Sequence, residues 1–88
     1  MPLVSVVMPV YNAAEYLEDA VESILRQTFR DFEFIIINDG STDGSSELLD
    51  LIQKKDSRVK VYHQENSGIV SALNKGCDIA QGKYIFRM

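Results

Sequence analysis

The fold of this chain is decided by the stretch Ile35-Ile-Ile-Asn-Asp-Gly-Ser-Thr-Asp-Gly44. The residues that lead into it, Phe32 to Ile37, are almost all apolar, which is typical of a strand that is covered on both faces of a sheet. The residues after Asp39 are types that form turns and cap helices, so the chain leaves the sheet in a short polar loop. The sequence therefore predicts a carboxylate at the end of a buried strand, in a loop suited to ligand contacts.

Outward from this stretch, apolar runs of strand length alternate with amphipathic runs of helix length, which indicates βαβ units. Strands are expected at Val4–Met8, Glu33–Ile37, Val59–His63 and Tyr84–Phe86. A first helix is expected to start at a capping box formed by Asn12 and Glu15. Two further helices are expected at residues 45–55 and 69–80. The stripe predicted to be buried in the last helix consists of Ile69, Ala72, Leu73, Gly76, Cys77 and Ala80.

Parallel strands joined by helices cross over right-handedly, and the most economical topology is an open sheet with strand order 3-2-1-4. We therefore expect an α/β domain in which an open, mainly parallel sheet lies between two layers of helices, a three-layer α/β/α arrangement. Ligands of such sheets bind outside the carboxyl ends of the strands where the order reverses, here between the first and fourth strands. The loops at residues 9–12 and 38–44 and the segment after Met88 are expected to meet there.

Composition restricts the classes of function. The chain has 88 residues, enough for one small domain, and its formal net charge of −4 gives no basic patch for a phosphate backbone. We therefore expect no nucleic-acid partner. The N-terminus lacks the features of a signal peptide, and no apolar run approaches the ~20 residues of a membrane span. Together with a single cysteine, Cys77, these observations predict a cytoplasmic location.

A family pattern is carried by the stretches Val4-Ser-Val-Val-Met-Pro-Val-Tyr-Asn12, Leu17-Glu-Asp-Ala-Val-Glu-Ser-Ile-Leu-Arg-Gln-Thr-Phe29, Ile36-Ile-Asn-Asp-Gly-Ser-Thr-Asp43, Glu65-Asn-Ser-Gly68 and Gly82-Lys-Tyr-Ile85. In this order they resemble the N-terminal half of a family 2 glycosyltransferase with the Rossmann-like GT-A fold. The resemblance implies transfer of a sugar from a nucleotide diphosphate donor, usually UDP-linked, to an acceptor hydroxyl with inversion at the anomeric carbon. The acceptor would be a sugar, a lipid or a polysaccharide, as in cell-wall or polysaccharide biosynthesis.

The resemblance also assigns roles to single residues. It implies that Tyr11 lies against the nucleobase, that Pro9 and Val10 shape the pocket, and that Asp39 hydrogen-bonds the uracil or the ribose. It also places Asn66 and Gly68 near the donor. The chemistry agrees, because an aromatic ring offers a flat stacking surface and a carboxylate accepts from an imide N–H or from hydroxyl groups.

The resemblance further implies two groups that this sequence lacks. The family continues beyond Ile85 into an Asp-x-Asp motif that holds Mg²⁺ or Mn²⁺ on the donor diphosphate, and a general-base carboxylate follows later. Because the chain ends at Met88, we expect residues 1–88 to be the incomplete nucleotide-sugar-binding part of a longer enzyme, with no catalytic residue and no tightly bound metal of its own. An exposed strand edge or apolar face would let this part self-associate. Any membrane attachment of the parent enzyme would lie in its missing C-terminal part.

Other classes of protein share parts of this pattern. A dinucleotide-dependent oxidoreductase needs G-x-G-x-x-G after the first strand, where this chain has Pro9-Val-Tyr-Asn-Ala-Ala14, and the P-loop motif of an NTPase is absent. A non-catalytic nucleotide-binding or assembly module with the same sheet remains an alternative. Among single residues, Asp39 has the alternative of an ordinary turn residue, Asp43 is assigned to helix capping, and His63 lacks partners at metal-ligand spacing.

Overall fold

Strands and helices alternate along the whole chain, as the sequence pattern predicts. The strands are β1 (Val4–Val10), β2 (Phe32–Asp39), β3 (Val59–Gln64) and β4 (Tyr84–Arg87), and the helices are α1 (Ala14–Leu25), α2 (Ser45–Lys55) and α3 (Ile69–Ile79). The structure is a computed structural model that describes residues 3–26 and 31–87. Residues 27–29, the end of the second family-like stretch, and Met88 lie outside these ranges. Within the described ranges, no helix has both the length and the apolar composition that crossing a lipid bilayer requires.

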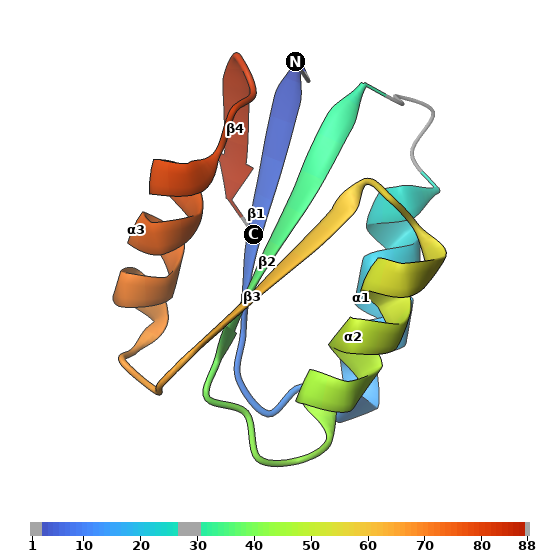
Figure 1. The fold of residues 1–88 in the computed structure, drawn as a ribbon, viewed down its shortest axis with the longest axis vertical. Helices are drawn as coiled ribbons and strands as arrows, with labels where there is room; N and C mark the ends of the chain where they lie inside the picture. The colour runs from blue at the N-terminus through green and yellow to red at the C-terminus, as the bar shows by residue number, and fades with distance from the viewer. Residues whose placement is uncertain (1–2, 27–30, 88) are drawn as a thin grey trace.

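The strands form one parallel sheet, and its order β3-β2-β1-β4 confirms the predicted topology. Figure 1 shows three layers, with α1 and α2 on one face of the sheet and α3 on the other. In the same view, the loops that leave β1 and β2 and the loop that enters α3 lie at the lower edge of the sheet. Side chains from distant parts of the sequence therefore meet at this edge.

Strand β2 forms the centre of the core, and all its residues are buried. Its side chains alternate between two apolar clusters, because successive residues of a strand point to opposite faces. Phe34 and Ile36 belong to the cluster that α1 and α2 cover, whereas Ile35 and Ile37 pack with Ala72 of α3 on the other face. A run that is apolar on both faces is thus used as the sequence predicts, as a strand covered on both sides.

Strand β1 continues beyond its predicted end at Met8 and includes Pro9 and Val10. Pro9 pairs in register with Ile37 of β2, and the described pairing of β1 with β4 covers Val4 to Val7. The strand extension therefore places two predicted pocket residues at the carboxyl end of β1.

The predicted capping box between Asn12 and Glu15 is wrong. Helix α1 begins at Ala14, and its N-cap residue, Ala13, makes no side-chain capping bond. The side-chain oxygen of Asn12 accepts instead from the backbone N–H of Thr42, at 2.7 Å. This side chain therefore connects the loop after β1 to the loop after β2.

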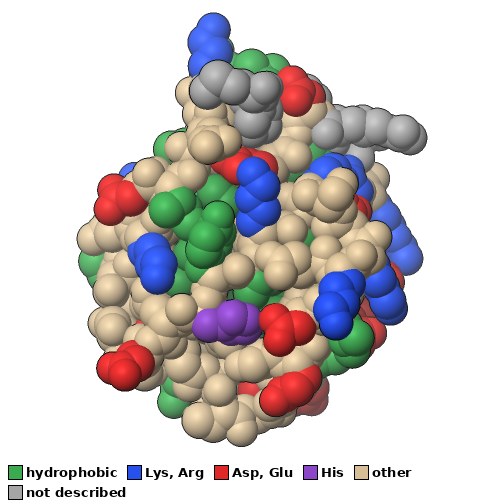
Figure 2. All heavy atoms as spheres, in the orientation of Figure 1, with side chains coloured by type: hydrophobic (Ala, Val, Ile, Leu, Met, Phe, Trp, Pro, Cys, Tyr) green, Lys and Arg blue, Asp and Glu red, His purple; other side chains and the backbone are tan. Residues whose placement is uncertain are grey.

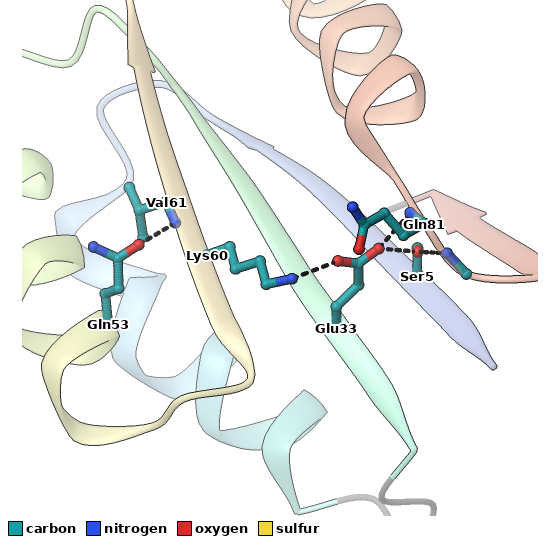
Figure 3. A network of polar contacts seen from close by, with 7 residues as sticks. Ser5, Glu33, Gln53, Lys60, Val61 and Gln81 are labelled. Carbon is teal, nitrogen blue, oxygen red and sulfur yellow. Dashed lines mark hydrogen bonds and ion pairs between the residues drawn. The ribbon is translucent and has the colours of Figure 1, made fainter. Parts of the chain in front are cut away.

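Glu33 lies in the buried apolar part of β2, and both oxygens of its carboxylate have donors. Ser5 Oγ and the Gln81 N–H donate to Oε2 at 2.5 and 2.6 Å, and Lys60 Nζ donates to Oε1 at 3.0 Å. Ser5 Oγ also accepts from the Gly82 N–H at 2.8 Å. Figure 3 shows that these groups converge on Glu33 from β1, β3 and the segment before β4. The network therefore ties the amino-terminal ends of the strands together.

Replacement of Gly76 by alanine is expected to destabilise the protein. In an open helix the same change stabilises by about 0.5–1 kcal/mol, but here an added Cβ would overlap the fully buried side chain of Val7. Overpacking costs about 1–3 kcal/mol, so urea titrations should show a net loss of unfolding free energy. Asn74→Ala, at an exposed position of α3, is the control and should be neutral or stabilising. A stabilised Gly76→Ala variant would mean that α3 lies farther from β1 than the structure shows.

Glu33→Gln is expected to destabilise the protein at neutral pH and to lose this effect in acid. Burial by itself would raise the pKa of Glu33, but the hydrogen bonds from Ser5, Gln81 and Lys60 lower it overall. Because the folded pKa lies below the unfolded one, the carboxylate stabilises the fold above the ordinary glutamate pKa, and this contribution is lost as the pH falls through the folded pKa. An amide cannot accept at both positions, so the free energy of unfolding should fall by about 1–3 kcal/mol near pH 7.

Urea unfolding of both proteins at neutral pH and at a pH below the glutamate range measures this effect. Glu18→Gln, at an exposed position of α1, removes the same charge without removing a buried acceptor. If Glu33→Gln destabilised the protein equally at both pH values, the charge of Glu33 would make no contribution to stability.

Candidate functional site

A pocket opens at the carboxyl ends of β1 and β2, beside the N-terminus of α3. Its volume is about 210 Å³. Its lining consists of Pro9, Val10, Tyr11, Asp39, Asn66, Gly68 and Ile69. The structure therefore brings together all six residues that the sequence analysis names as candidate binding residues, and it adds Ile69.

One wall of the pocket comes from a segment that the strand order does not indicate, although the family resemblance places Asn66 and Gly68 there. The sequence predicts a crevice between β1 and β4 that is completed by the segment after Met88. In the structure, the residues at 66–69, which lead from β3 into α3, form a wall of the pocket. The reason is that α3 packs on Val7, Ile35 and Ile37 of β1 and β2, which brings its N-terminus to this edge of the sheet.

Asp39 is the last residue of β2, and only 3% of its surface is exposed. Gln64 Nε2 and the Ser67 N–H donate to its Oδ1 at 2.7 and 2.9 Å, and the Gly68 N–H donates to its Oδ2 at 3.0 Å. These hydrogen bonds, that from Gln64 foremost, hold the pKa of Asp39 below its usual range. The carboxylate is therefore ionised at neutral pH. Since a carboxylate has about four lone-pair sites, one acceptor position is left, on Oδ2.

The apolar side of the pocket is open to solvent. Tyr11, directly after β1, is 54% exposed, and Ile69, the first residue of α3, is 64% exposed. The prediction that Ile69 belongs to the buried stripe of its helix is wrong, because the buried residues of α3 are Ala72 and Gly76, farther along the helix. Exposed apolar groups beside an ionised carboxylate suit a ligand that has a flat apolar face and a polar edge.

The residues at 41–45 do not line the pocket but hold the start of α1. The backbone N–H groups of residues 12–14 donate to three side chains of this loop, namely Ser41 Oγ at 3.0 Å, Ser45 Oγ at 3.2 Å and Asp43 Oδ2 at 3.1 Å. Asp43 Oδ1 also accepts from the Ser45 N–H at 3.1 Å, at the start of α2. Asp43 therefore accepts a hydrogen bond at the start of each of the two helices, although the N-cap residue of α2 is Gly44 and not Asp43. The hydroxyl of Ser45 is the main cause of a lowered pKa at Asp43.

His63 contacts polar side chains through both of its ring nitrogens, which the sequence analysis did not predict. Its Nδ1 lies 2.9 Å from Asn38 Nδ2, and its Nε2 lies 3.1 Å from Asp50 Oδ1. Asn38 is 2% exposed and also donates to Ser46 Oγ at 2.7 Å. In Figure 2 the histidine side chain (purple) lies at the surface next to an acidic side chain. The signal for this role was the strand register, because His63 pairs with Asn38, the residue before Asp39.

Gly40 allows the loop after β2 to pass close to Asn66. Its φ is +73°, and an added Cβ would lie 2.7 Å from the backbone nitrogen of Asn66. Asn66 Nδ2 in turn donates to the carbonyl oxygen of Asp39 at 3.1 Å. A glycine after Asp39 is therefore needed for the two sides of the pocket to approach each other.

The pocket residues do not fit a divalent cation. In the part of the chain that the structure describes, no group of three or more His, Cys, Asp or Glu side chains is placed to hold a metal ion. The one carboxylate of the pocket, Asp39, already accepts from three N–H donors.

Comparison with curated proteins gives relatives that are longer than this chain. Residues 5–88 match the sequence profile of Glycosyl transferase family 2. Glycosyltransferase GlyG from Streptococcus pneumoniae is 49% identical over 84 residues, which are 94% of this chain and 28% of that protein. The putative teichuronic acid biosynthesis glycosyltransferase TuaG from Bacillus subtilis is 48% identical over 85 residues, 96% of this chain and 34% of that protein. The chain thus spans about a third or less of the length of these relatives.

Solved structures share the fold. The mannosyltransferase PcManGT from Pyrobaculum calidifontis, in complex with GDP-Man and Mn²⁺, has a TM-score of 0.87 at 25% identity, over 96% of this chain and 26% of that one. TarS from S. aureus, in complex with UDP, has a TM-score of 0.88 at 26% identity, over 100% of this chain and 27% of that one. The parallel sheet described above is thus that of GT-A glycosyltransferases, and the match over residues 5–88 shows that the chain belongs to glycosyl transferase family 2.

Proposed function

We propose that the pocket binds the nucleoside of a nucleotide-sugar donor, and that the chain is the N-terminal nucleotide-sugar-binding part of an inverting glycosyltransferase. The observation that carries this proposal is the state of Asp39, an ionised and buried carboxylate that keeps one acceptor position in a pocket beside the exposed ring of Tyr11. The solved structures of similar proteins with UDP and GDP-Man support it.

Uracil is the base that fits Asp39 best. The edge of guanine presents an N–H and an amino group side by side, and a ribose presents two hydroxyl groups, so each would use two acceptors. Asp39 has only one left, because Gln64, Ser67 and Gly68 occupy the others. Uracil presents a single imide N–H. We therefore propose a UDP-linked donor, with Asp39 Oδ2 accepting from the imide and Tyr11 stacking on the ring.

The pocket is large enough to enclose only part of the nucleotide-sugar donor. Pockets that enclose drug-sized ligands have volumes of about 300–1,000 Å³, whereas this one has about 210 Å³. We assign Pro9 and Val10 to the wall beneath the base, and Asn66 and Gly68 to the wall formed by the segment before α3. The diphosphate and the sugar would extend out of the pocket.

The proposed inverting sugar transfer is a single displacement, in which an acceptor hydroxyl attacks the anomeric carbon as the bond to the diphosphate breaks. It needs charge stabilisation at the leaving diphosphate and a base near the hydroxyl. Since the described residues do not fit a metal site, we assign Mg²⁺ or Mn²⁺ and the base to parts of a longer protein. The chain alone would then bind nucleotide in the cytoplasm without transferring sugar to its sugar, lipid or polysaccharide acceptor.

Titration of uridine diphosphate into the chain, followed by backbone amide shifts, tests the proposed nucleotide binding. The amides of residues 9–12 and 66–69 should shift at millimolar ligand, and Asp39→Ala should abolish the shifts, because a hydrogen bond to a charged group is worth tenfold or more in affinity, about 1.5–3 kcal/mol. The N3-methyl analogue of uridine diphosphate lacks the imide N–H. It should bind to the unchanged protein as weakly as uridine diphosphate binds to Asp39→Ala.

The control for Asp39→Ala is Asp78→Ala, which removes an exposed carboxylate from α3 and should leave the shifts unchanged. The assignment of the pocket is wrong if saturating uridine diphosphate moves neither group of amides. The assignment of uracil to Asp39 is wrong if the N3-methyl analogue binds as well as uridine diphosphate.

We also propose that the isolated chain self-associates through β4. Among the described strands, β4 pairs only with β1, and its residues are exposed, with Tyr84 at 54%, Ile85 at 44% and Phe86 at 61%. An unpaired strand edge with apolar side chains is a site where a second copy adds. Sedimentation velocity should show concentration-dependent association that Ile85→Lys weakens. Leu51→Lys, at an exposed apolar position of α2, is the matched control, and a monomer at all concentrations would contradict the proposal.

A further inference from the structure

Gln64 is the last residue of β3 and lies beside the pocket without lining it. It pairs in register with Asp39 across the parallel strands β3 and β2. Paired residues of neighbouring strands present their side chains on the same face of the sheet, here the face that α3 covers. Gln64 Nε2 donates to Asp39 Oδ1 at 2.7 Å, which makes it a neighbour of the proposed nucleoside contact.

The three donors on Asp39 come from two different parts of the chain. The N–H groups of Ser67 and Gly68 belong to the loop before α3, and both residues are exposed. Gln64 donates from within the sheet. Because the terminal torsion of an aspartate is broad, the carboxylate can turn, and without Gln64 its orientation would depend on the two loop donors alone. The donor from β3 ties the carboxylate to the hydrogen-bonded sheet.

The chemical nature of this donor also matters. An amide N–H stabilises the ionised carboxylate without bringing a charge, so Asp39 keeps its strength as an acceptor for a ligand. In agreement with the geometry, the hydrogen bond from Gln64 is the main cause of the lowered pKa of Asp39. A side chain of the same length without a donor would remove this effect and leave the surrounding packing in place.

We propose that Gln64 is a positioning residue for nucleoside recognition: its side-chain amide fixes the carboxylate of Asp39 so that the remaining acceptor position on Oδ2 faces the ligand. This inference rests on the proposed function of the pocket. Gln64 itself does not touch the nucleoside, and the contact between Gln64 and Asp39 exists without it.

The first test replaces Gln64 by methionine, which has a similar length and no donor. The affinity for uridine diphosphate should fall about fivefold, as expected for one net hydrogen bond, and the pKa of the Asp39 carboxyl, followed by carbon-13 NMR without ligand, should rise. Gln53→Met is the matched control, because it also removes one hydrogen bond to β3, from the Val61 N–H to Gln53 Oε1 at 2.6 Å, but it leaves Asp39 untouched. It should change neither measurement.

The second test replaces Gln64 by glutamate, which puts two carboxylates side by side. Near neutral pH their repulsion should weaken binding of uridine diphosphate relative to the unchanged protein. As the pH is lowered toward about 5.5, a proton shared by the pair restores a donor to Asp39, so the ratio of the two affinities should return toward one. A purely structural role for Gln64 would leave this ratio independent of pH.

The outcomes separate the inference from the proposed function. If the unchanged protein binds uridine diphosphate and Gln64→Met binds it equally well, the positioning role is wrong and the proposed function stands. If the unchanged protein does not bind uridine diphosphate, the proposed function is wrong, and the positioning role falls with it. An unchanged pKa of Asp39 in Gln64→Met would overturn the inference in either case.

Discussion

The structure depends on strand β2, which carries a buried carboxylate near each end on the face that α3 covers. Glu33 accepts the backbone N–H of Gln81, after α3, and Asp39 accepts those of Ser67 and Gly68, before it. At about 3.3 Å per residue the two carboxylates lie ~20 Å apart along the strand, and at about 1.5 Å per residue α3 is ~16 Å long. The helix and its flanking residues therefore fit between them, so hydrogen bonds as well as apolar packing set the position of α3 on the sheet.

The two carboxylates meet opposite ends of the helix dipole. Asp39 lies at the N-terminus of α3, where a negative charge is favourable, and Glu33 lies near the C-terminus, where it is not. Lys60, 3.0 Å from Glu33, supplies the positive charge at that end. At the Glu33 end of the strand, protein groups donate to both carboxylate oxygens. At the Asp39 end, one acceptor position of the carboxylate is free, and a pocket is open beside it. One strand thus has a structural end and the end proposed to bind the ligand.

Alternating apolar and amphipathic runs were sufficient to predict the order of the strands, because right-handed crossovers leave few arrangements. The candidate pocket residues came from a family resemblance, since no spacing rule connects Tyr11 with Asn66. The partners of polar side chains were the part that the sequence could not show. Asn12 and Glu15 fit a local capping box, but the donor that Asn12 meets is the Thr42 N–H on another loop. Such a choice depends on how loops pack after the sheet has formed, and local patterns do not contain it.

The two tasks of Asp39 are physically coupled. The carboxylate that holds the N-terminus of α3 is also the proposed contact for the nucleoside. A ligand that binds to the carboxylate in this position binds only the folded chain, and it therefore stabilises the folded chain by mass action. The N–H donors that satisfy Asp39 in the absence of ligand keep it ionised and oriented, so little reorganisation is needed on binding. They also take up most of its acceptor positions, and this restricts which ligand edge it can accept. Specificity for a single N–H donor would then follow from the way the fold is closed, and not from an additional residue in the pocket.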